Sequence, residues 1–160
     1  MVALTKKSAK KFAFEEFAKM KPSVEKRFLV QHTKGVVKTA LKLAKNKKVD
    51  KNSLEIACWL HDVARSIQSE NHAQLGVKMV IGKFGKINPI IEDCIANHGS
   101  SKDPQTEEGK IIQVADKLSI MNDFKLFEII FAKEKYKEES LKMIDYVSKD
   151  LIEVLKRYNC

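Results

Sequence analysis

Apolar residues recur at helical spacing along almost the whole chain. Residues 88–98 place Ile91, Cys94 and Ile95 three and four positions apart, and residues 25–47 repeat the pattern at Val36, Val37, Ala40, Leu41 and Ala44. Side chains at these spacings share one face of a helix, and that face can be buried against other helices. The pattern therefore predicts an all-α fold.

Length and composition favour one domain. The chain has 160 residues, 44% of them hydrophobic, with only three prolines and six glycines, which suits one helical core but not two enzyme-sized domains. We expect a single-domain helical bundle of about six to seven helices. It comprises a basic N-terminal helix within residues 1–22, a core over residues 27–122 and C-terminal helices over residues 124–160.

The sequence contains no sign of export or of membrane insertion. No stretch approaches the ~20 consecutive apolar residues of a membrane span, and the N-terminus lacks a signal-peptide pattern, so we expect a cytoplasmic protein without membrane partners. The three cysteines, Cys58, Cys94 and Cys160, are widely spaced and indicate neither a disulfide framework nor a zinc knuckle. We predict that Cys58 and Cys94 are buried.

The positive charge is concentrated in the first third of the chain. Residues 1–51 contain 15 Lys and Arg but only 4 Asp and Glu, whereas the whole chain carries a net charge of +9. Such a surface can attract an anionic partner, nucleic acid included. Because the run lacks arginine clusters and regular aromatic residues, we favour a solvated lysine-rich surface over a nucleic-acid site.

Local signals predict where helices begin, end and pack. Ser53 is a candidate N-cap, and Gly82 and Gly85 are candidate helix stops. One side of the last helix should carry Leu141, Ile144, Val147, Leu151, Leu155 and Tyr158. We expect Phe124, Phe127 and Phe131 to lie in the core, although the same side chains could also form the face of a homodimer.

A few polar residues fall on the faces that should point inward. They include all four histidines of the chain and are His32, His61, Asp62, His72, His98 and Asp116. Alone, a histidine on an apolar face is usually a hydrogen-bonded core residue, and a carboxylate such as Asp116 is costly to bury unless it is paired. Together, imidazoles and carboxylates from several helices can hold one or two metal ions.

The spacing of four of these residues resembles the HD superfamily of metal-dependent phosphohydrolases. His61-Asp62 follows His32 by 29 residues, and Asp116 follows Asp62 by 54. The surrounding segments HTKGVVKTALKLA, ACWLHDVAR and IIQVADKLS are also similar to the family's ligand helices. The resemblance covers residues 27–122 and is strongest to a small two-metal branch typified by the dinucleoside-tetraphosphate hydrolase YqeK.

The resemblance implies a ligand set. It makes His32, His61, Asp62 and Asp116 the ligands of one ion, with Asp62 bridging to a second ion that His72 and His98 also bind. The cofactor would be one or two divalent ions, Fe, Mn, Co, Ni, Zn or Mg, because these ligand types suit several metals.

The implied activity is metal-dependent hydrolysis of a nucleotide or another small phosphoester, by attack of a metal-activated water on phosphorus. Asp62 and Arg65 are the candidate catalytic residues. Arg65, three residues after Asp62, would also bind a phosphate oxygen of the substrate, and Lys117 is a weaker candidate of the same kind.

Two alternatives stay open. A di-iron branch of the same superfamily uses a similar ligand set for oxygenation, and only turnover experiments separate the two chemistries. The domain could also bind a nucleotide or RNA through its basic first third without catalysis.

Overall fold

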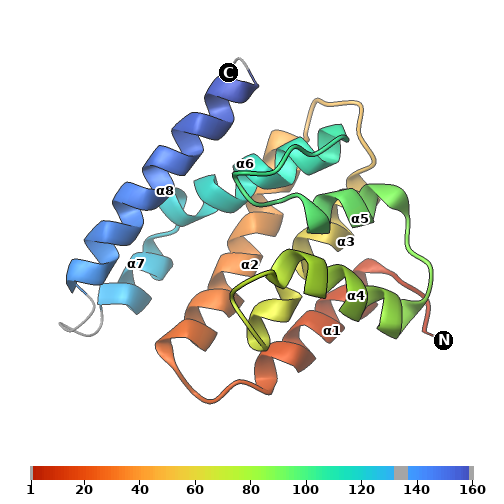
Figure 1. Cartoon of the computed structure of the whole chain (residues 1–160), viewed down its shortest axis with the longest axis horizontal. Coiled ribbons are helices and arrows are strands. Elements are labelled where there is room, and N and C mark those ends of the chain that lie inside the picture. The colour runs from red at the N-terminus through yellow and green to blue at the C-terminus, as the bar shows by residue number, and fades with distance from the viewer. Residues whose placement is uncertain (1, 132–136, 159–160) are drawn as a thin grey trace.

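The computed structural model describes residues 2–131 and 137–158, in which every regular element is helical (Figure 1). The elements are α1 (Lys6–Ala18), α2 (Val24–Leu43), α3 (Lys51–Leu60), a short 3-10 turn η1 (Val63–Ser66), α4 (His72–Phe84), α5 (Pro89–Ala96), α6 (Glu107–Asn122), α7 (Phe124–Phe131) and α8 (Lys137–Arg157). The predicted all-α fold is therefore confirmed. None of the described helices is both long enough and apolar enough to cross a membrane.

Helix α2 runs through the middle of the bundle. It packs against α6 and α3, while α1 and α5 cover α3 and α8 packs against α6 (Figure 1). The largest apolar cluster contains residues from each of the helices α1 to α6. Among its fully buried members are Val36, Leu54, Ile95 and Ile112. Six segments that are far apart in the sequence thus surround one core, and the polar residues on their inner faces are brought together.

The helix ends agree with the sequence signals only in part. Helix α3 is capped by Asp50, whose Oδ1 accepts the backbone N–H of Ser53 at 3.0 Å. The prediction that Ser53 is the N-cap is therefore wrong, because the aspartate three residues earlier already satisfies that donor. Helix α4 continues through Gly82 and ends at Gly85, whose φ of 82° suits glycine.

Three lysines, two of them in the basic first third of the chain, lie over aromatic rings. The ammonium groups of Lys10, Lys34 and Lys83 lie 5.0, 5.7 and 5.5 Å from the ring centroids of Trp59, Phe14 and Phe12. Ammonium groups over aromatic faces are stabilising at these distances. Lys10 and Lys34 thus contact aromatic rings of the protein itself, and nucleic-acid binding stays untested.

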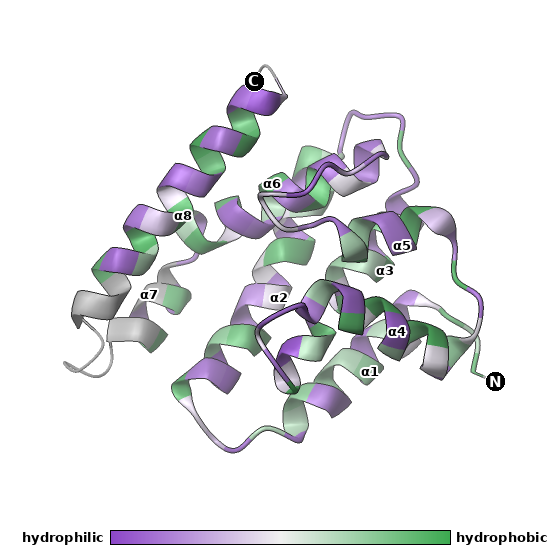
Figure 2. Cartoon of the chain, viewed as in Figure 1, coloured by the Kyte–Doolittle hydropathy of each residue, from purple (hydrophilic) through white to green (hydrophobic). Residues whose placement is uncertain are grey.

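Helix α8 lies on the far side of α6 from α5, with hydrophobic and hydrophilic residues alternating along it (Figures 1 and 2). Val147 and Val154 are buried, whereas Leu141, predicted on the same side of the helix as Val147, is 59% exposed. Cys58 and Cys94 are buried as predicted. Cys160 and the side chains of Phe124, Phe127 and Phe131 lie outside the described part of the chain, so the choice between core and dimer face stays a prediction.

Candidate metal centre

The six predicted polar residues lie together at the centre of the bundle. His32 is on α2, His72 is the first residue of α4, and Asp116 is on α6. His61, Asp62 and His98 were expected on α-helices. They instead follow helix ends, because α3 ends at Leu60 and α5 at Ala96. Five of the six are buried, and only His72 has a partly exposed side chain, at 22%.

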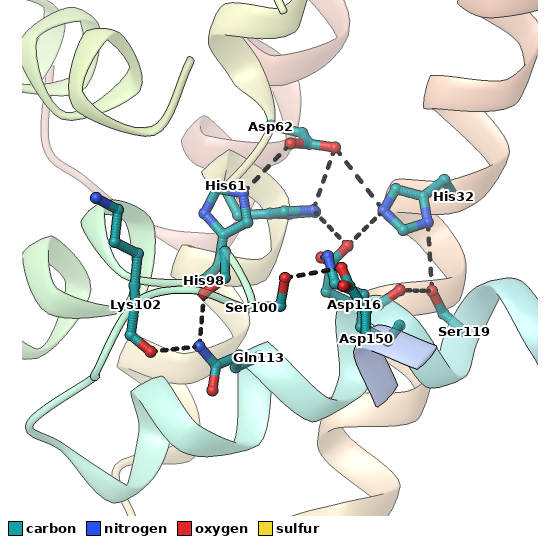
Figure 3. Close-up of polar contacts among 12 residues, drawn as sticks. His32, His61, Asp62, His98, Ser100, Lys102, Gln113, Asp116, Ser119 and Asp150 are labelled. Atoms are coloured by element: carbon teal, nitrogen blue, oxygen red, sulfur yellow. Dashed lines mark hydrogen bonds and ion pairs between the residues drawn. The ribbon is translucent and has the colours of Figure 1, made fainter. Parts of the chain in front are cut away.

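These side chains form two groups that could each hold a metal ion. In the first group, ligand atoms of His32, His61 and Asp116 lie within 4.8 Å of one another, and in the second group those of Asp62, His72 and His98 do the same. Figure 3 shows His61 and Asp62 between His32 and His98, above Asp116. The fold therefore brings the six predicted residues together, and their role as metal ligands stays a prediction.

Asp62 connects the two groups because its two carboxylate oxygens point to different histidines. Its Oδ2 lies 3.5 Å from His61 Nε2 and 3.8 Å from His32 Nε2, both in the first group. Its Oδ1 lies 3.2 Å from His72 Nε2 and 3.5 Å from His98 Nε2, both in the second group. This is the arrangement of a carboxylate that can bridge two ions.

Helix ends orient two of the histidines. His61 Nδ1 lies 2.9 Å from the carbonyl oxygen of Cys58, and His98 Nδ1 lies 2.8 Å from that of Ile95. Both carbonyls belong to the last turn of a helix, where they have no intrahelical partner. Since a carbonyl only accepts, Nδ1 carries the hydrogen and Nε2 of each neutral ring is left with a lone pair.

His72 has the same tautomer, whereas His32 has an acceptor near each ring nitrogen, because its Nε2 lies 2.8 Å from Asp116 Oδ1. His72 Nδ1 lies 2.7 Å from the carbonyl oxygen of Ser69. His32 Nδ1 lies 3.3 Å from Ser119 Oγ, whose own hydrogen goes to the carbonyl of Asp116 at 2.9 Å. Partners of this kind are typical of histidines that ligate metals through Nε2.

The Nε2 atoms of His61, His72 and His98 converge without hydrogens to share. His72 Nε2 and His98 Nε2 are 3.0 Å apart, and two lone pairs at this distance repel unless a proton or a cation lies between them. Ligands bound to one ion at 2.0–2.1 Å are separated by roughly 3.0–3.5 Å. His61 Nε2 is buried and has no hydrogen-bond partner among the described residues, although such atoms normally have one. The residues therefore fit a divalent cation.

The electrostatics of the centre favour charged carboxylates. Burial would raise the pKa of the Asp62 carboxyl, but the surrounding histidines and Arg65 outweigh burial and hold the pKa well below its usual range. For Asp116, burial is likewise outweighed, mainly by Lys117, and the pKa is again well below normal. Burial lowers the pKa of His98, whereas for His61 the two carboxylates overcome burial and raise the pKa. Two buried anions thus face four imidazoles.

Two cations flank the carboxylates. Arg65 Nη1 lies 3.8 Å from Asp62 Oδ2, and the arginine side chain is 37% exposed. Lys117 Nζ lies 2.6 Å from Asp116 Oδ2 and its side chain is only 14% exposed. Arg65 is thus at the edge of the centre, where a substrate could reach it, whereas Lys117 is paired with a predicted ligand.

Three residues next to the centre were not predicted from the sequence. Ser119 orients His32, and the ring of Phe28 stacks on that of His32 with centroids 5.5 Å apart. Gln113, fully buried on α6 one turn before Asp116, holds the loop after His98. A glutamine inside the apolar run IIQVAD was a signal for this position, because a buried amide needs partners.

Comparison with known proteins identifies the family and the fold of the chain. The family model described as HD domain matches residues 29–121. A crystal structure described as a predicted HD superfamily hydrolase, from an uncultured Thermotogales bacterium, matches with a TM-score of 0.64 and 23% identity, over 95% of this chain and 90% of that chain. At this identity the likeness shows a shared fold. No curated protein matches the chain.

Proposed function

The chain belongs to the HD domain family, and from this premise we propose that it is a metal-dependent phosphohydrolase that acts on a nucleotide or another small phosphoester. The observation that carries the proposal is the bridging position of Asp62 between the two groups, in which the Nε2 atoms of His61, His72 and His98 lack hydrogens. Divalent ions held there would supply a water of lowered pKa and a Lewis acid for a phosphoryl oxygen.

The chain's own residues would divide the remaining work. His32, His61 and Asp116 would hold one ion, His72 and His98 a second, and Asp62 both. The carbonyl and hydroxyl partners of the Nδ1 atoms keep the rings in place without rearrangement. Preorganised ligands of this kind keep metal affinity high.

Arg65 is the proposed substrate-binding residue. Its guanidinium is partly exposed and lies beside Asp62, so a phosphate oxygen could accept two of its N–H groups while another oxygen faces the ions. Lys117 is less suited to this role, because its ammonium group already contacts Asp116 at 2.6 Å. It would balance the negative charge of the centre.

The first experiment is a turnover assay with several metals. The purified protein is incubated anaerobically with diadenosine tetraphosphate and, separately, with nucleoside mono-, di- and triphosphates, each with Fe²⁺, Mn²⁺, Co²⁺ or Mg²⁺. Two ADP from the tetraphosphate would indicate the YqeK-like specificity, and inorganic phosphate would indicate a nucleotidase. If no substrate is cleaved anaerobically, turnover that begins when oxygen is admitted would instead support the di-iron oxygenase.

A matched pair of variants tests the role of the centre. Asp62→Asn keeps the shape of the side chain but removes its charge, and we expect turnover to fall by at least about a thousandfold, as for loss of an essential group. Glu16→Gln makes the same change at another buried carboxylate, on α1, and should keep activity. Wild-type turnover by Asp62→Asn would refute the proposed mechanism.

A further inference from the structure

The loop that follows His98 is held by a buried side chain of α6. This segment, residues 99–102, is called the His98 loop here. Gln113 Nε2 donates to the carbonyl oxygens of Gly99 at 2.6 Å and Lys102 at 3.0 Å. Because Gln113 lies one turn before Asp116, one helix supports both the first group and the loop beside the second.

Helix α8 holds the same loop from the other side. Arg157 donates from Nη1 to the carbonyl of Lys102 and from Nη2 to that of Ser100, the latter at 2.9 Å. Ser100 Oγ donates to Asp150 Oδ2 at 2.7 Å, as Figure 3 shows. Tyr158, just after α8, donates through its hydroxyl to Gln113 Oε1. The C-terminal half of α8 therefore contacts both the loop and the glutamine that holds it.

These bonds add to the loop's own backbone bond, in which the N–H of Lys102 donates to the carbonyl of Gly99 at 3.0 Å. Outside helices, backbone carbonyls need partners from side chains or water. A guanidinium is planar and presents its N–H groups in a rigid fork, so Arg157 fixes two carbonyls relative to each other. His98 directly precedes this segment, and its Nε2 must stay near Asp62 Oδ1, at 3.5 Å, to serve the second group.

We infer that α8 is a positioning element of the metal centre: Arg157 and Asp150 fix the His98 loop and thereby set the affinity of the second group for a divalent ion. The inference rests on the proposed function and adds a role for residues outside the matched range 29–121. Among the contacts of the described residues, Arg157 and Asp150 meet the His98 loop and no predicted ligand, so we assign their effect to the loop.

Electrostatics alone predicts that loss of Arg157 strengthens metal binding, whereas a positioning role predicts that it weakens metal binding. The two explanations can therefore be distinguished. Arg157 is a cation, and removing a cation near a metal site should strengthen the binding of another cation. If Arg157 acts by positioning, its removal should weaken binding instead. Lys156, exposed in the same turn of α8, offers a matched control because Lys156→Ala removes the same charge without touching the loop.

The test is a Co²⁺ titration of the full-length chain, followed by visible absorption and checked by elemental analysis. For Arg157→Ala we expect the first equivalent to bind as in the wild type and the second to bind roughly tenfold more weakly, the lower end of losses seen when a ligand's supporting partner is removed. Arg157→Lys should resemble Arg157→Ala, because it lacks the fork. Ser100→Ala, which removes the bond to Asp150, should also weaken the binding of the second equivalent of Co²⁺. Lys156→Ala should leave the affinity for the second equivalent unchanged.

Hydrogen exchange in the metal-free protein gives a readout independent of metal. The amides of residues 99–102 should exchange faster in Arg157→Ala than in the wild type, while those of α3 stay unchanged. Equal second-site affinity and equal exchange in Arg157→Ala and the wild type would overturn the inference and leave the proposed function intact. A wild type that binds no Co²⁺ would overturn both.

Discussion

At the scale of single residues, His72 is the ligand candidate that can be removed with least effect on folding. Its side chain is partly exposed and it lies at the start of α4. We expect His72→Ala to bind about one equivalent of metal per chain where the wild type binds two, with a free energy of unfolding for the metal-free protein within about 0.5 kcal/mol of the wild type. Elemental analysis and denaturant unfolding measure the two quantities. The control variant Gln74→Ala changes an exposed residue in the same turn of α4, and it should still bind two equivalents of metal per chain. Two equivalents in His72→Ala would contradict its assignment to the second group.

Sequence reasoning at this scale found the ligand candidates but not what orients them. Histidine and aspartate are recognisable by type and spacing, so His32, His61, Asp62 and Asp116 could be predicted together. The Nδ1 partners could not, because three of them are backbone carbonyls, of Cys58, Ile95 and Ser69. Every residue has such a carbonyl, so residue type carries no signal. Only the place where a helix ends decides which carbonyls are free.

At the scale of elements, the start of α6 depends on a glycine. A Cβ at Gly109 would lie 2.6 Å from Pro104 Cβ and 2.7 Å from Asp93 Oδ2, which also accepts the Thr106 hydroxyl at 2.6 Å. We expect Gly109→Ala to lower the free energy of unfolding by about 1–3 kcal/mol, the usual cost of overpacking. Thermal and urea unfolding measure it.

Gly82 provides the matched control, because a Cβ there meets no atom within 4 Å and the residue lies inside α4. Gly82→Ala should therefore stabilise the protein, by about 0.5–1 kcal/mol, since alanine loses less entropy than glycine in a helix. Equal effects of the two changes would show that the crowding at Gly109 does not matter.

The elements also show why periodicity predicted the fold better than the site. The apolar spacing located α2 and α5 well because burial of one face is what forms a helix in a protein. The same spacing placed His61 and His98 on helices, although both follow a helix end. Leaving the helix frees the carbonyl that orients each ring, so the departure from periodicity is what builds the centre.

At the scale of the whole molecule, one centre joins segments from residue 32 to residue 116, and α8 joins through the His98 loop. The fold class followed from composition and periodicity, and the core range 27–122 was close to the matched range 29–121. The attachment of α8 could not be predicted, because Arg157 binds carbonyls 55 and 57 positions away. Long-range contacts to backbone leave no pattern in one sequence.

A centre shared by so many segments should couple metal binding to global stability. Without a cation, the buried carboxylate of Asp62 faces Nε2 lone pairs of His61, His72 and His98, whereas a bound ion stabilises only the folded arrangement. An ion at 100 times its Kd contributes about 2.7 kcal/mol, which for a domain of this size raises the Tm by roughly 5–10 °C. We therefore expect EDTA to lower the Tm of metal-loaded protein by that amount, measured by calorimetry, and added metal to restore it.

Two variants serve as controls for this effect. The Tm of Glu16→Gln should fall on addition of EDTA as much as that of the wild type, and the Tm of Asp62→Asn should fall much less. A wild-type Tm that is the same with and without EDTA would mean that the buried carboxylates are satisfied without an ion, and the assignment of the whole centre to metal would fail.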